Sequence, residues 1–224
     1  MEHRVWYVAY GSNLASARFR CYLAGGRPAG GARVYDGCRD TSDPVQSVGV
    51  EIPGGLVFAG NSAVWQGGMA FYERQGAGVV AGRAHLVTDE QLADIAAQEL
   101  RRPPGGEFAR DLTGLLPDVE SVVTTGGGLY ETVVRLGERD EVPMFTITHH
   151  DVASLEPTAP SASYLRWIAI GLREAHEYDA ERTARYLAVA PGVRGNWTVS
   201  DLHALALSAD AVVDATTFSA QAEP

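Results

Sequence analysis

The sequence contains no lysine: all 18 residues counted as Lys or Arg are arginine. A chain without lysine cannot form a Schiff base, which excludes pyridoxal-phosphate enzymes and lysine-dependent aldolases. It also lacks the lysine of a Walker A phosphate loop, so its 25 glycines do not form a classical P-loop. The composition therefore removes two large classes of enzyme.

Cysteine and positive charge are also scarce. Cys21 and Cys38 are too few for a disulfide scaffold or a structural zinc site, and we expect both to be reduced core residues. The net charge of −10 argues against nucleic acid or an anionic membrane surface as a partner. The sequence has no transmembrane-length apolar run and no signal-like apolar region, so we expect a cytoplasmic protein.

What is present indicates a folded α+β protein. The chain has 224 residues, of which 46% are hydrophobic and 21% charged, enough for one domain with an elaboration. We predict a small mixed or antiparallel β-barrel with packed helices. Strand-like runs lie at residues 5–10, 32–35, 56–58, 69–72, 79–87, 129–136 and 144–148. Helical patterns lie at residues 14–23, 91–100, 164–175 and 179–187.

The remaining segments are less regular. We interpret residues 25–55 as rich in turns and residues 105–125 as a connecting insertion, because both lack a sustained apolar period. A short C-terminal helix is expected to begin at Ser200, with an alanine-rich tail that frays after Asp210.

One stretch organises the chain, residues 5–14 with the sequence VWYVAYGSNL. Its first half predicts a buried strand. Gly11 then allows backbone angles or a close approach that a Cβ would forbid, and Ser12 and Asn13 are good helix N-caps. A strand, a tight polar turn and a helix start leave backbone N–H groups unpaired at one spot, which suits a carboxylate or a developing oxyanion. An ordinary strand-to-helix turn fits the same spacing.

A carboxylate on the apolar face of a predicted helix is the second notable feature. Residues 88–91 (TDEQ) form a capping box. Leu92, Ile95 and Ala96 follow at i, i+3 and i+4, and Glu99 occupies i+7 on the same face. Burial would raise its pKa toward the range in which it can both take and give a proton near neutrality. A frayed helix end, or pairing with the arginines that follow, is the alternative.

The histidines offer weaker candidates. We expect His85, within the predicted strand 79–87, to be a satisfied sheet residue. His149 and His150 resemble part of a metal site or catalytic triad, but adjacent residues on a strand point to opposite sides. We therefore predict a surface or capping role for this pair, and no metal site.

The stretch Tyr10-Gly11-Ser12-Asn13-Leu14 after a hydrophobic strand resembles the signature loop of the gamma-glutamylcyclotransferase-like family. Three further stretches follow in the family's order. Residues 61–71 (NSAVWQGGMAF) carry a Trp before a glycine pair and a strand, residues 92–99 end in the family's catalytic Glu, and residues 157–164 (PTAPSASY) form a turn before a Tyr and a helix. The glycine pair lets another backbone or a ligand approach closely, or forms a bulge at which a barrel bends.

The resemblance covers roughly residues 5–175. It implies a gamma-glutamylcyclotransferase-like domain over residues 1–175, with residues 176–224 as a helical extension packed on it. One departure is Leu100, which follows Glu99 where the family usually has Gly. That difference concerns the local backbone more than the carboxylate.

The activity that the resemblance implies is release of 5-oxoproline from a γ-glutamyl amide, in which the substrate's own α-amine attacks and the amide C–N bond breaks. Glu99 would be the general acid and base. The resemblance implies no metal and no cofactor. The residues expected to bind the substrate are Tyr10, Gly11, Ser12, Asn13, Leu14 and Tyr164.

Two other functions fit parts of the sequence. A non-catalytic module that binds a small metabolite could use the same glycine-rich loop and acidic residue. Ser12 could be an acyl nucleophile with His149 or His150 as base, although Gly-Ser-Asn is not the Gly-x-Ser-x-Gly elbow. For the leaving amine, an amino acid, glutathione, a polyamine and a biosynthetic intermediate all fit the same core.

Overall fold

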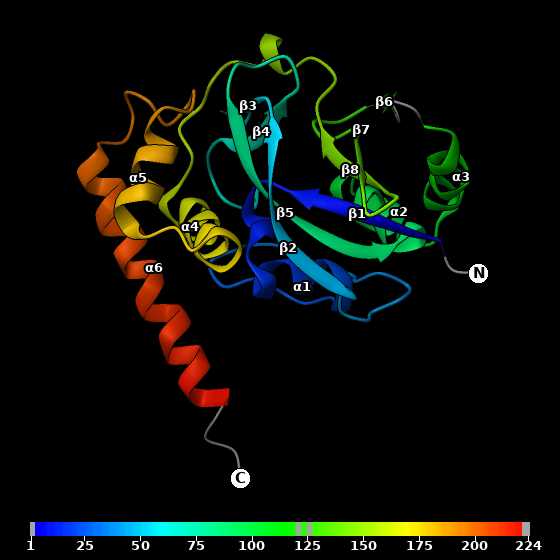
Figure 1. Ribbon diagram of the computed structural model, residues 1–224, viewed down its shortest axis with the longest axis horizontal. Coiled ribbons are helices and arrows are strands. Elements are labelled where there is room, and N and C mark those ends of the chain that lie inside the picture. The colour runs from blue at the N-terminus through cyan, green and yellow to red at the C-terminus, as the bar shows by residue number, and fades with distance from the viewer. Residues whose placement is uncertain (1–2, 120–121, 125–126, 221–224) are drawn as a thin grey trace.

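The computed structural model describes residues 3–119, 122–124 and 127–220, and it is built on a six-stranded sheet (Figure 1). Neighbouring strands are antiparallel except β1 and β8, which run parallel. A separate two-stranded sheet pairs β3 (Gly55–Ala59) with β4 (Met69–Glu73). The spatial order of the large sheet is β2 (Gln46–Pro53), β5 (Val79–Thr88), β1 (Arg4–Ala9), β8 (Val142–Thr148), β7 (Thr132–Arg139) and β6 (Val122–Thr124).

Strand β1 lies in the middle of this sheet and is buried on both faces. Trp6 and Val8 enter one hydrophobic core, whereas Val5 and Tyr7 enter another. A strand covered on both faces needs apolar residues at successive positions, which explains the unbroken apolar run in the sequence. The loop that follows β1 therefore leaves the sheet between two packed layers.

Helices cover both faces of the sheet (Figure 1). The Val5 side is covered by α1 (Ser16–Ala24), α2 (Asp89–Glu99) and α3 (Glu107–Leu115). The Trp6 side is covered by α4 (Ala162–His176), α5 (Ala180–Ala188) and α6 (Val199–Ala220). Three short 3-10 helices complete the described elements: η1 (Ser12–Leu14), η2 (Leu116–Asp118) and η3 (Val152–Ser154).

The C-terminal helices share a core with the sheet. Ala184 and Leu187 of α5 and Leu202 of α6 belong to the same buried cluster as Trp6. The domain boundary at residue 175 stays a prediction. The fraying expected after Asp210 also stays a prediction; α6 runs from Val199 to Ala220.

The mixed α+β class is confirmed, but barrel closure is not seen. In the part of the chain that the structure describes, β2 and β6 are the two edges of the large sheet, and β3–β4 forms a sheet of its own. Apolar alternation predicts that a segment is a strand, whereas pairing depends on contacts between distant segments. The sequence pattern therefore predicted the strands but could not predict whether they close into a barrel.

Four of the described elements fall where we predicted irregular chain. Strand β2 lies within residues 25–55, and α3, η2 and β6 lie within residues 105–125. Strand β2 was missed because it is a partly exposed edge strand with Gly49 in its interior. The glycine is needed there, since a Cβ would lie 2.2 Å from the carbonyl oxygen of Ala175.

Another local difference concerns residues 32–35. They do not form the strand that we predicted, and Tyr35 instead makes an isolated bridge with Gly26.

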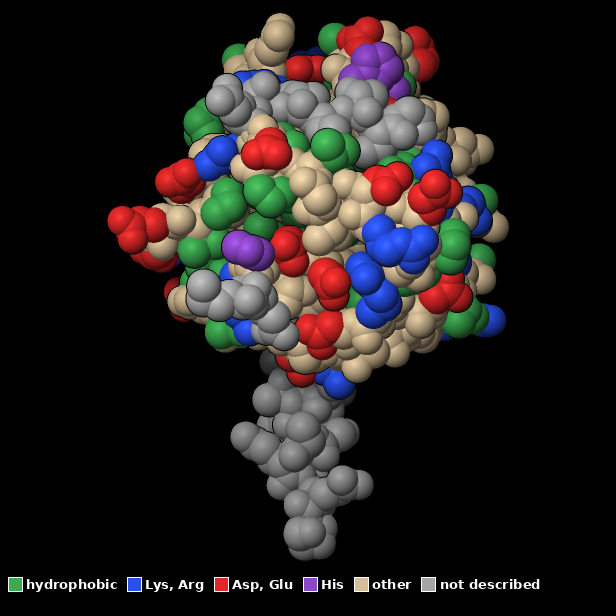
Figure 2. All heavy atoms as spheres, turned by 90° about the vertical axis from the view of Figure 1, so that its right-hand side faces the viewer, with side chains coloured by type: hydrophobic (Ala, Val, Ile, Leu, Met, Phe, Trp, Pro, Cys, Tyr) green, Lys and Arg blue, Asp and Glu red, His purple; other side chains and the backbone are tan. Residues whose placement is uncertain are grey.

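The outer surface carries both signs of charge. On the face shown in Figure 2, arginine side chains lie among aspartates and glutamates. None of the helices in the described ranges is long and apolar enough to cross a lipid bilayer.

Candidate active site

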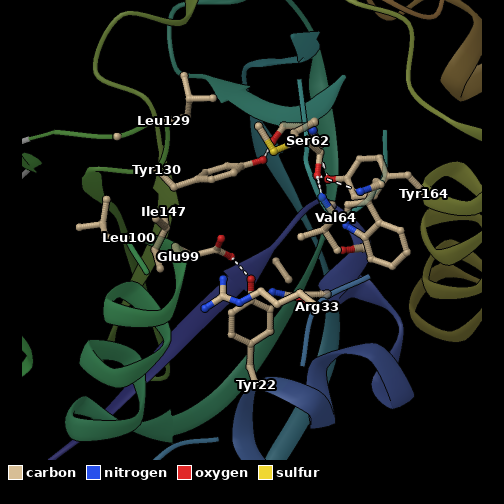
Figure 3. Close-up of a pocket in the computed structure, with 18 of the residues that line it drawn as sticks. Tyr22, Arg33, Ser62, Val64, Glu99, Leu100, Leu129, Tyr130, Ile147 and Tyr164 are labelled. Atoms are coloured by element: carbon tan, nitrogen blue, oxygen red, sulfur yellow. Dashed lines mark hydrogen bonds between the residues drawn. The ribbon is translucent and has the colours of Figure 1, made fainter. Parts of the chain in front are cut away.

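A pocket of about 350 Å³ opens beside the end of β1 (Figure 3). Its walls come from the loop after β1, from α1, from the end of α2, from the start of β4 and of α4, and from the segments that precede β2, β4 and β7. Figure 3 shows Glu99 pointing toward the hydroxyl of Tyr22, with Tyr130 and Tyr164 reaching in from other elements. The polar and charged residues that line it are Tyr7, Tyr10, Ser12, Asn13, Arg18, Tyr22, Arg33, Tyr35, Asn61, Ser62, Glu99, Arg101, Tyr130 and Tyr164.

The loop after β1 begins with an anchored tyrosine. The Tyr10 hydroxyl donates to the carbonyl oxygen of Ile147 at 2.6 Å, which fixes the point where the chain leaves the sheet. Gly11 has a negative φ of −108°, so it is not needed for a left-handed conformation. It is needed for close approach, since a Cβ there would lie 2.9 Å from the Tyr164 hydroxyl oxygen.

The backbone of this loop leaves donors available. The amides of Leu14 and Ala15 donate to the carbonyl oxygens of Gly11 and Ser12. Among the described residues, the amides of Gly11, Ser12 and Asn13 have no such acceptor. They are the unpaired donors expected at the start of a helical turn.

Asn13 also has a side chain in the pocket, and it is only 7% exposed. Its Nδ2 donates to the Tyr7 hydroxyl at 3.4 Å, whereas its Oδ1 is buried without a hydrogen-bond partner in the described part of the chain. The Asn13 carbonyl contacts Nε2 of His85 at 3.3 Å. Burial lowers the pKa of His85 to about 3, and its Nδ1 meets the Ser47 hydroxyl, so the prediction of a satisfied sheet histidine is confirmed.

The capped helix α2 delivers Glu99 to the pocket. The predicted capping box is present: Thr88 accepts from the Gln91 amide, and the Gln91 side chain accepts from the Thr88 amide, both at 3.0 Å. Leu92 and Ile95 are fully buried and set the rotation of the helix. That rotation turns Glu99, one turn later, toward the pocket.

Opposing influences act on the pKa of the Glu99 carboxyl group. Burial raises the pKa of this group, while the hydrogen bond from Tyr22 and the positive charges of Arg18 and Arg33 act in the opposite direction. The Tyr22 hydroxyl donates to Glu99 Oε1 at 2.6 Å. In the described part of the chain no ion pair joins Glu99 to Arg101, which follows the helix end with a left-handed φ of 58°.

Arg18 is a pocket residue that the sequence reasoning missed. It comes from α1, is only 2% exposed, and its Nη2 donates to the Tyr35 hydroxyl at 2.7 Å. Its guanidinium carbon lies 4.7 Å from the ring centre of Tyr22, 4.5 Å from that of Tyr35 and 5.6 Å from that of Trp65. Arg18 precedes Tyr22 by four positions, so the helical spacing that pointed to Glu99 could have found it.

Tyr164 closes another wall of the pocket. Its hydroxyl accepts from the Ala70 amide at 3.1 Å, and the Tyr130 hydroxyl donates to the Ala70 carbonyl at 2.7 Å. Burial raises the pKa of Tyr164 to about 12, so it is neutral at physiological pH. Leu14, by contrast, does not line the pocket: it is fully buried against α4, where a Cβ on Gly171 would lie 2.2 Å from the Leu14 Cβ.

The glycine pair of residues 67–68 serves a backbone approach. A Cβ on Gly68 would lie 2.1 Å from the carbonyl oxygen of Thr158, and the Gly68 amide donates to the Ala159 carbonyl at 2.9 Å. The pair thus seats the segment that leads into α4 and Tyr164. Of the alternatives for this pair, close approach by another backbone is the one observed.

The structure corrects our argument about His149 and His150. Strand β8 ends at Thr148, so the two histidines do not alternate across a strand. Their ring centres lie 4.5 Å apart, and ligand atoms of both histidines and Glu131 lie within 4.8 Å of one another, close enough to hold a metal ion. Glu131 Oε1 also accepts from the His150 backbone amide at 2.8 Å, as expected for a residue that caps a turn.

Neither histidine lines the pocket that contains Ser12. The arrangement therefore gives no support to Ser12 as a nucleophile with a histidine base.

Comparison with known sequences gives limited similarity. No protein-family model matches the chain. Among curated proteins, histone deacetylase 5 of Arabidopsis thaliana is 27% identical over 199 residues, which cover 82% of this chain and 30% of that protein. The chain thus spans less than a third of the length of this curated relative.

Comparison with solved structures gives likeness along most of the chain. An uncharacterized human protein has a TM-score of 0.49 and 17% identity, covering 90% of this chain and 99% of that one. A gamma-glutamyl cyclotransferase has a TM-score of 0.49 and 16% identity, covering 92% and 99%. YkqA of Bacillus subtilis has a TM-score of 0.41 and 17% identity, covering 84% and 55%. The solved structures similar to this chain thus include a gamma-glutamyl cyclotransferase, from the family that its four sequence stretches resemble.

Proposed function

We propose that this chain releases 5-oxoproline and an amine or amino acid from a γ-glutamyl amide. The observation that carries the proposal is the pairing of two features in one pocket: the Glu99 carboxyl group, whose pKa is raised by burial, and the Gly11–Asn13 loop, whose amides donate to no carbonyl oxygen among the described residues. The four family-like stretches support the same activity, because three of them contribute Glu99, this loop and Tyr164.

The reaction is an intramolecular acyl transfer. The α-amine of the substrate attacks its own γ-carbonyl carbon, a five-membered ring closes, and the C–N bond to the leaving amine breaks. Because both reacting groups belong to one molecule, folding the substrate into the attacking conformation supplies much of the rate enhancement. The remaining task of the protein is to move protons and to stabilise charge on the carbonyl oxygen.

Glu99 is suited to move both protons. As a carboxylate it takes a proton from the α-ammonium group, and as a carboxylic acid it returns that proton to the departing nitrogen. A pKa above the ordinary value makes the second step easier near neutral pH. The Tyr22 hydroxyl, at 2.6 Å, orients the carboxyl group.

The loop amides are suited to stabilise the oxyanion. Backbone N–H groups that need no rearrangement are effective donors to an oxygen that gains negative charge in the transition state. The amides of Gly11, Ser12 and Asn13 would serve in this way: these residues line the pocket, and their amides donate to no carbonyl oxygen within the described residues. No step in this scheme requires a metal ion or a redox cofactor.

A non-catalytic binding module is the competing function, because a binding site would use the same loop and the same buried charges. The test is incubation with a panel of γ-glutamyl amides, whose leaving groups are an amino acid, the cysteinylglycine of glutathione and a polyamine. Release of 5-oxoproline is measured by mass spectrometry. Turnover of any member that Glu99→Gln abolishes supports the enzyme, whereas binding without turnover supports the module.

A further inference from the structure

Arg18 has a buried positive charge that forms no ion pair with any residue that the structure describes. Its side chain is 2% exposed, yet in the described part of the chain neither Nε nor Nη1 has a hydrogen-bond acceptor, and no ion pair involves it. The Tyr35 hydroxyl, at 2.7 Å, takes one donor of Nη2. Three N–H bonds, one on Nε and two on Nη1, are left unused in a pocket wall.

Burying a guanidinium group costs free energy of folding unless a partner accepts its hydrogen bonds and balances its charge. A buried charge is normally paired, because its lost hydration is not recovered otherwise. The faces of Tyr22, Tyr35 and Trp65 offset part of that cost through cation–π contacts. They cannot satisfy N–H donors in the plane of the guanidinium, whereas an anionic acceptor that enters the pocket would complete these hydrogen bonds and balance the charge.

The other charges in the pocket narrow the chemistry of this anion. Arg33 and Arg101 also line the pocket and add positive charge. Glu99, by contrast, lies close enough to affect the pKa of Arg18 and would attract a positive group next to the bound anion. Asn13 adds a buried Oδ1 acceptor to which no described residue donates, and such an acceptor suits an ammonium group. A ligand that carries a carboxylate and an ammonium on neighbouring atoms, as the α-carbon of an amino acid does, complements Arg18 and Glu99 together.

We propose that Arg18 binds the α-carboxylate of the substrate, which leaves the loop amides to the oxyanion. This inference rests on the proposed function and names the residue that selects a γ-glutamyl group over a simple γ-amino acyl group. Arginine is well suited to the role, because its planar donors match a carboxylate.

The test removes first the α-carboxylate of the substrate and then the guanidinium group of Arg18. One substrate is a γ-glutamyl amide, and the other is the same amide without the α-carboxylate, a 4-aminobutanoyl amide that cyclises to 2-pyrrolidinone. Both are assayed with wild type and with Arg18→Met, which keeps length and apolar contact. Removing the carboxylate also changes the basicity of the amine, so the ratio of kcat/KM for the two substrates is compared between the two proteins.

The preference is the ratio of kcat/KM for the γ-glutamyl amide to kcat/KM for the amide without the carboxylate. We expect this ratio to be at least about 10²-fold larger in wild type than in Arg18→Met, roughly the effect of losing one buried charge pair. Arg20→Met, on the exposed side of the same helix, is the matched control and should keep the full preference. Thermal melting verifies that the variants fold. If Arg18→Met does not fold, Arg18→Gln replaces it in the same assay, and the expected change in preference is the same.

The outcomes separate this inference from the proposed function. Turnover of the γ-glutamyl amide with equal preference in wild type and Arg18→Met overturns the role of Arg18 and leaves the reaction intact. If neither amide is turned over, the reaction is wrong, and calorimetric binding of both amides decides about Arg18. Carboxylate-dependent binding that Arg18→Met loses supports the inference, whereas equal binding or none overturns it.

Discussion

Replacing Glu99 with Gln removes the proposed proton acceptor from the pocket and changes little else. The amide has nearly the same size, and its oxygen can still accept the Tyr22 hydroxyl that now donates to Oε1 at 2.6 Å. General acid and base assistance contributes on the order of 10²–10⁴ in rate, so kcat for a γ-glutamyl amide should fall by about that factor. Substrate binding should persist, because neither the loop nor Arg18 is altered.

The assay is release of 5-oxoproline measured across pH. In the wild type, kcat/KM should rise with pH as Glu99 loses its proton, because only the carboxylate accepts the proton of the α-ammonium group. Burial raises the pKa of Glu99, so the midpoint should lie above the ordinary value of 4.5. Glu99→Gln should lack this limb, whereas the control Glu90→Gln, on the exposed side of the same helix, should keep it. Near-full turnover by Glu99→Gln would refute the reasoning.

The same variant has a stability signature whose sign follows from the pKa. Folding raises the pKa of Glu99, so the folded state favours the protonated carboxyl group and ionisation opposes folding. The penalty is absent below the unfolded-state pKa and complete above the folded-state pKa. Glu99→Gln should therefore melt at a higher temperature than wild type at neutral pH, with the gain vanishing below about pH 4. A gain that persists in acid would indicate better packing instead.

Three further predictions concern residues that support the pocket. Tyr22→Phe removes a hydrogen bond that lowers the pKa of Glu99, so the rise of kcat/KM with pH should move to higher pH when release of 5-oxoproline is measured across pH. Gly11→Ala brings a methyl group within 2.9 Å of the Tyr164 hydroxyl oxygen and should lower kcat/KM by up to about 10²-fold, with part of the activity restored by Tyr164→Phe. Asp94→Ala should lower the free energy of unfolding by about 3 kcal/mol in urea titrations, because the buried carboxylate accepts from two backbone amides and one guanidinium.

Features set by neighbouring residues could be predicted from the sequence. The capping box fixes where α2 begins, and the spacing from Leu92 to Glu99 then fixes which way the carboxylate faces. The turn at Gly11 is equally local, although the reason for the glycine is the Tyr164 hydroxyl, more than 150 positions away. Local patterns located these two parts of the site but not their contact partners.

Features set by distant contacts could not be predicted in this way. Arg18 lies among rings from α1, the segment before β2 and the segment before β4, and no spacing in the sequence joins Tyr35 and Trp65 to it. Strand β2 is defined by its pairing with β5, and the glycine in its interior is explained by the close approach of Ala175. The error about His149 had a different origin, since the opposite-face argument assumed a strand that ends one residue earlier.

Tyr22 lies between the Glu99 carboxyl group and the Arg18 guanidinium, and its position explains how both fit in one small pocket without forming an ion pair with each other among the described contacts. Its hydroxyl donates to Glu99 while the face of its ring lies 4.7 Å from the guanidinium carbon of Arg18. Opposite charges that met directly would form an ion pair, which would lower the pKa of Glu99 and occupy the donors of Arg18. By contacting each charge with a different part of its side chain, Tyr22 keeps the carboxyl group available for proton transfer and the guanidinium available for a carboxylate. The two functions proposed for the pocket therefore depend on the same tyrosine, which sits one helical turn after Arg18 on α1.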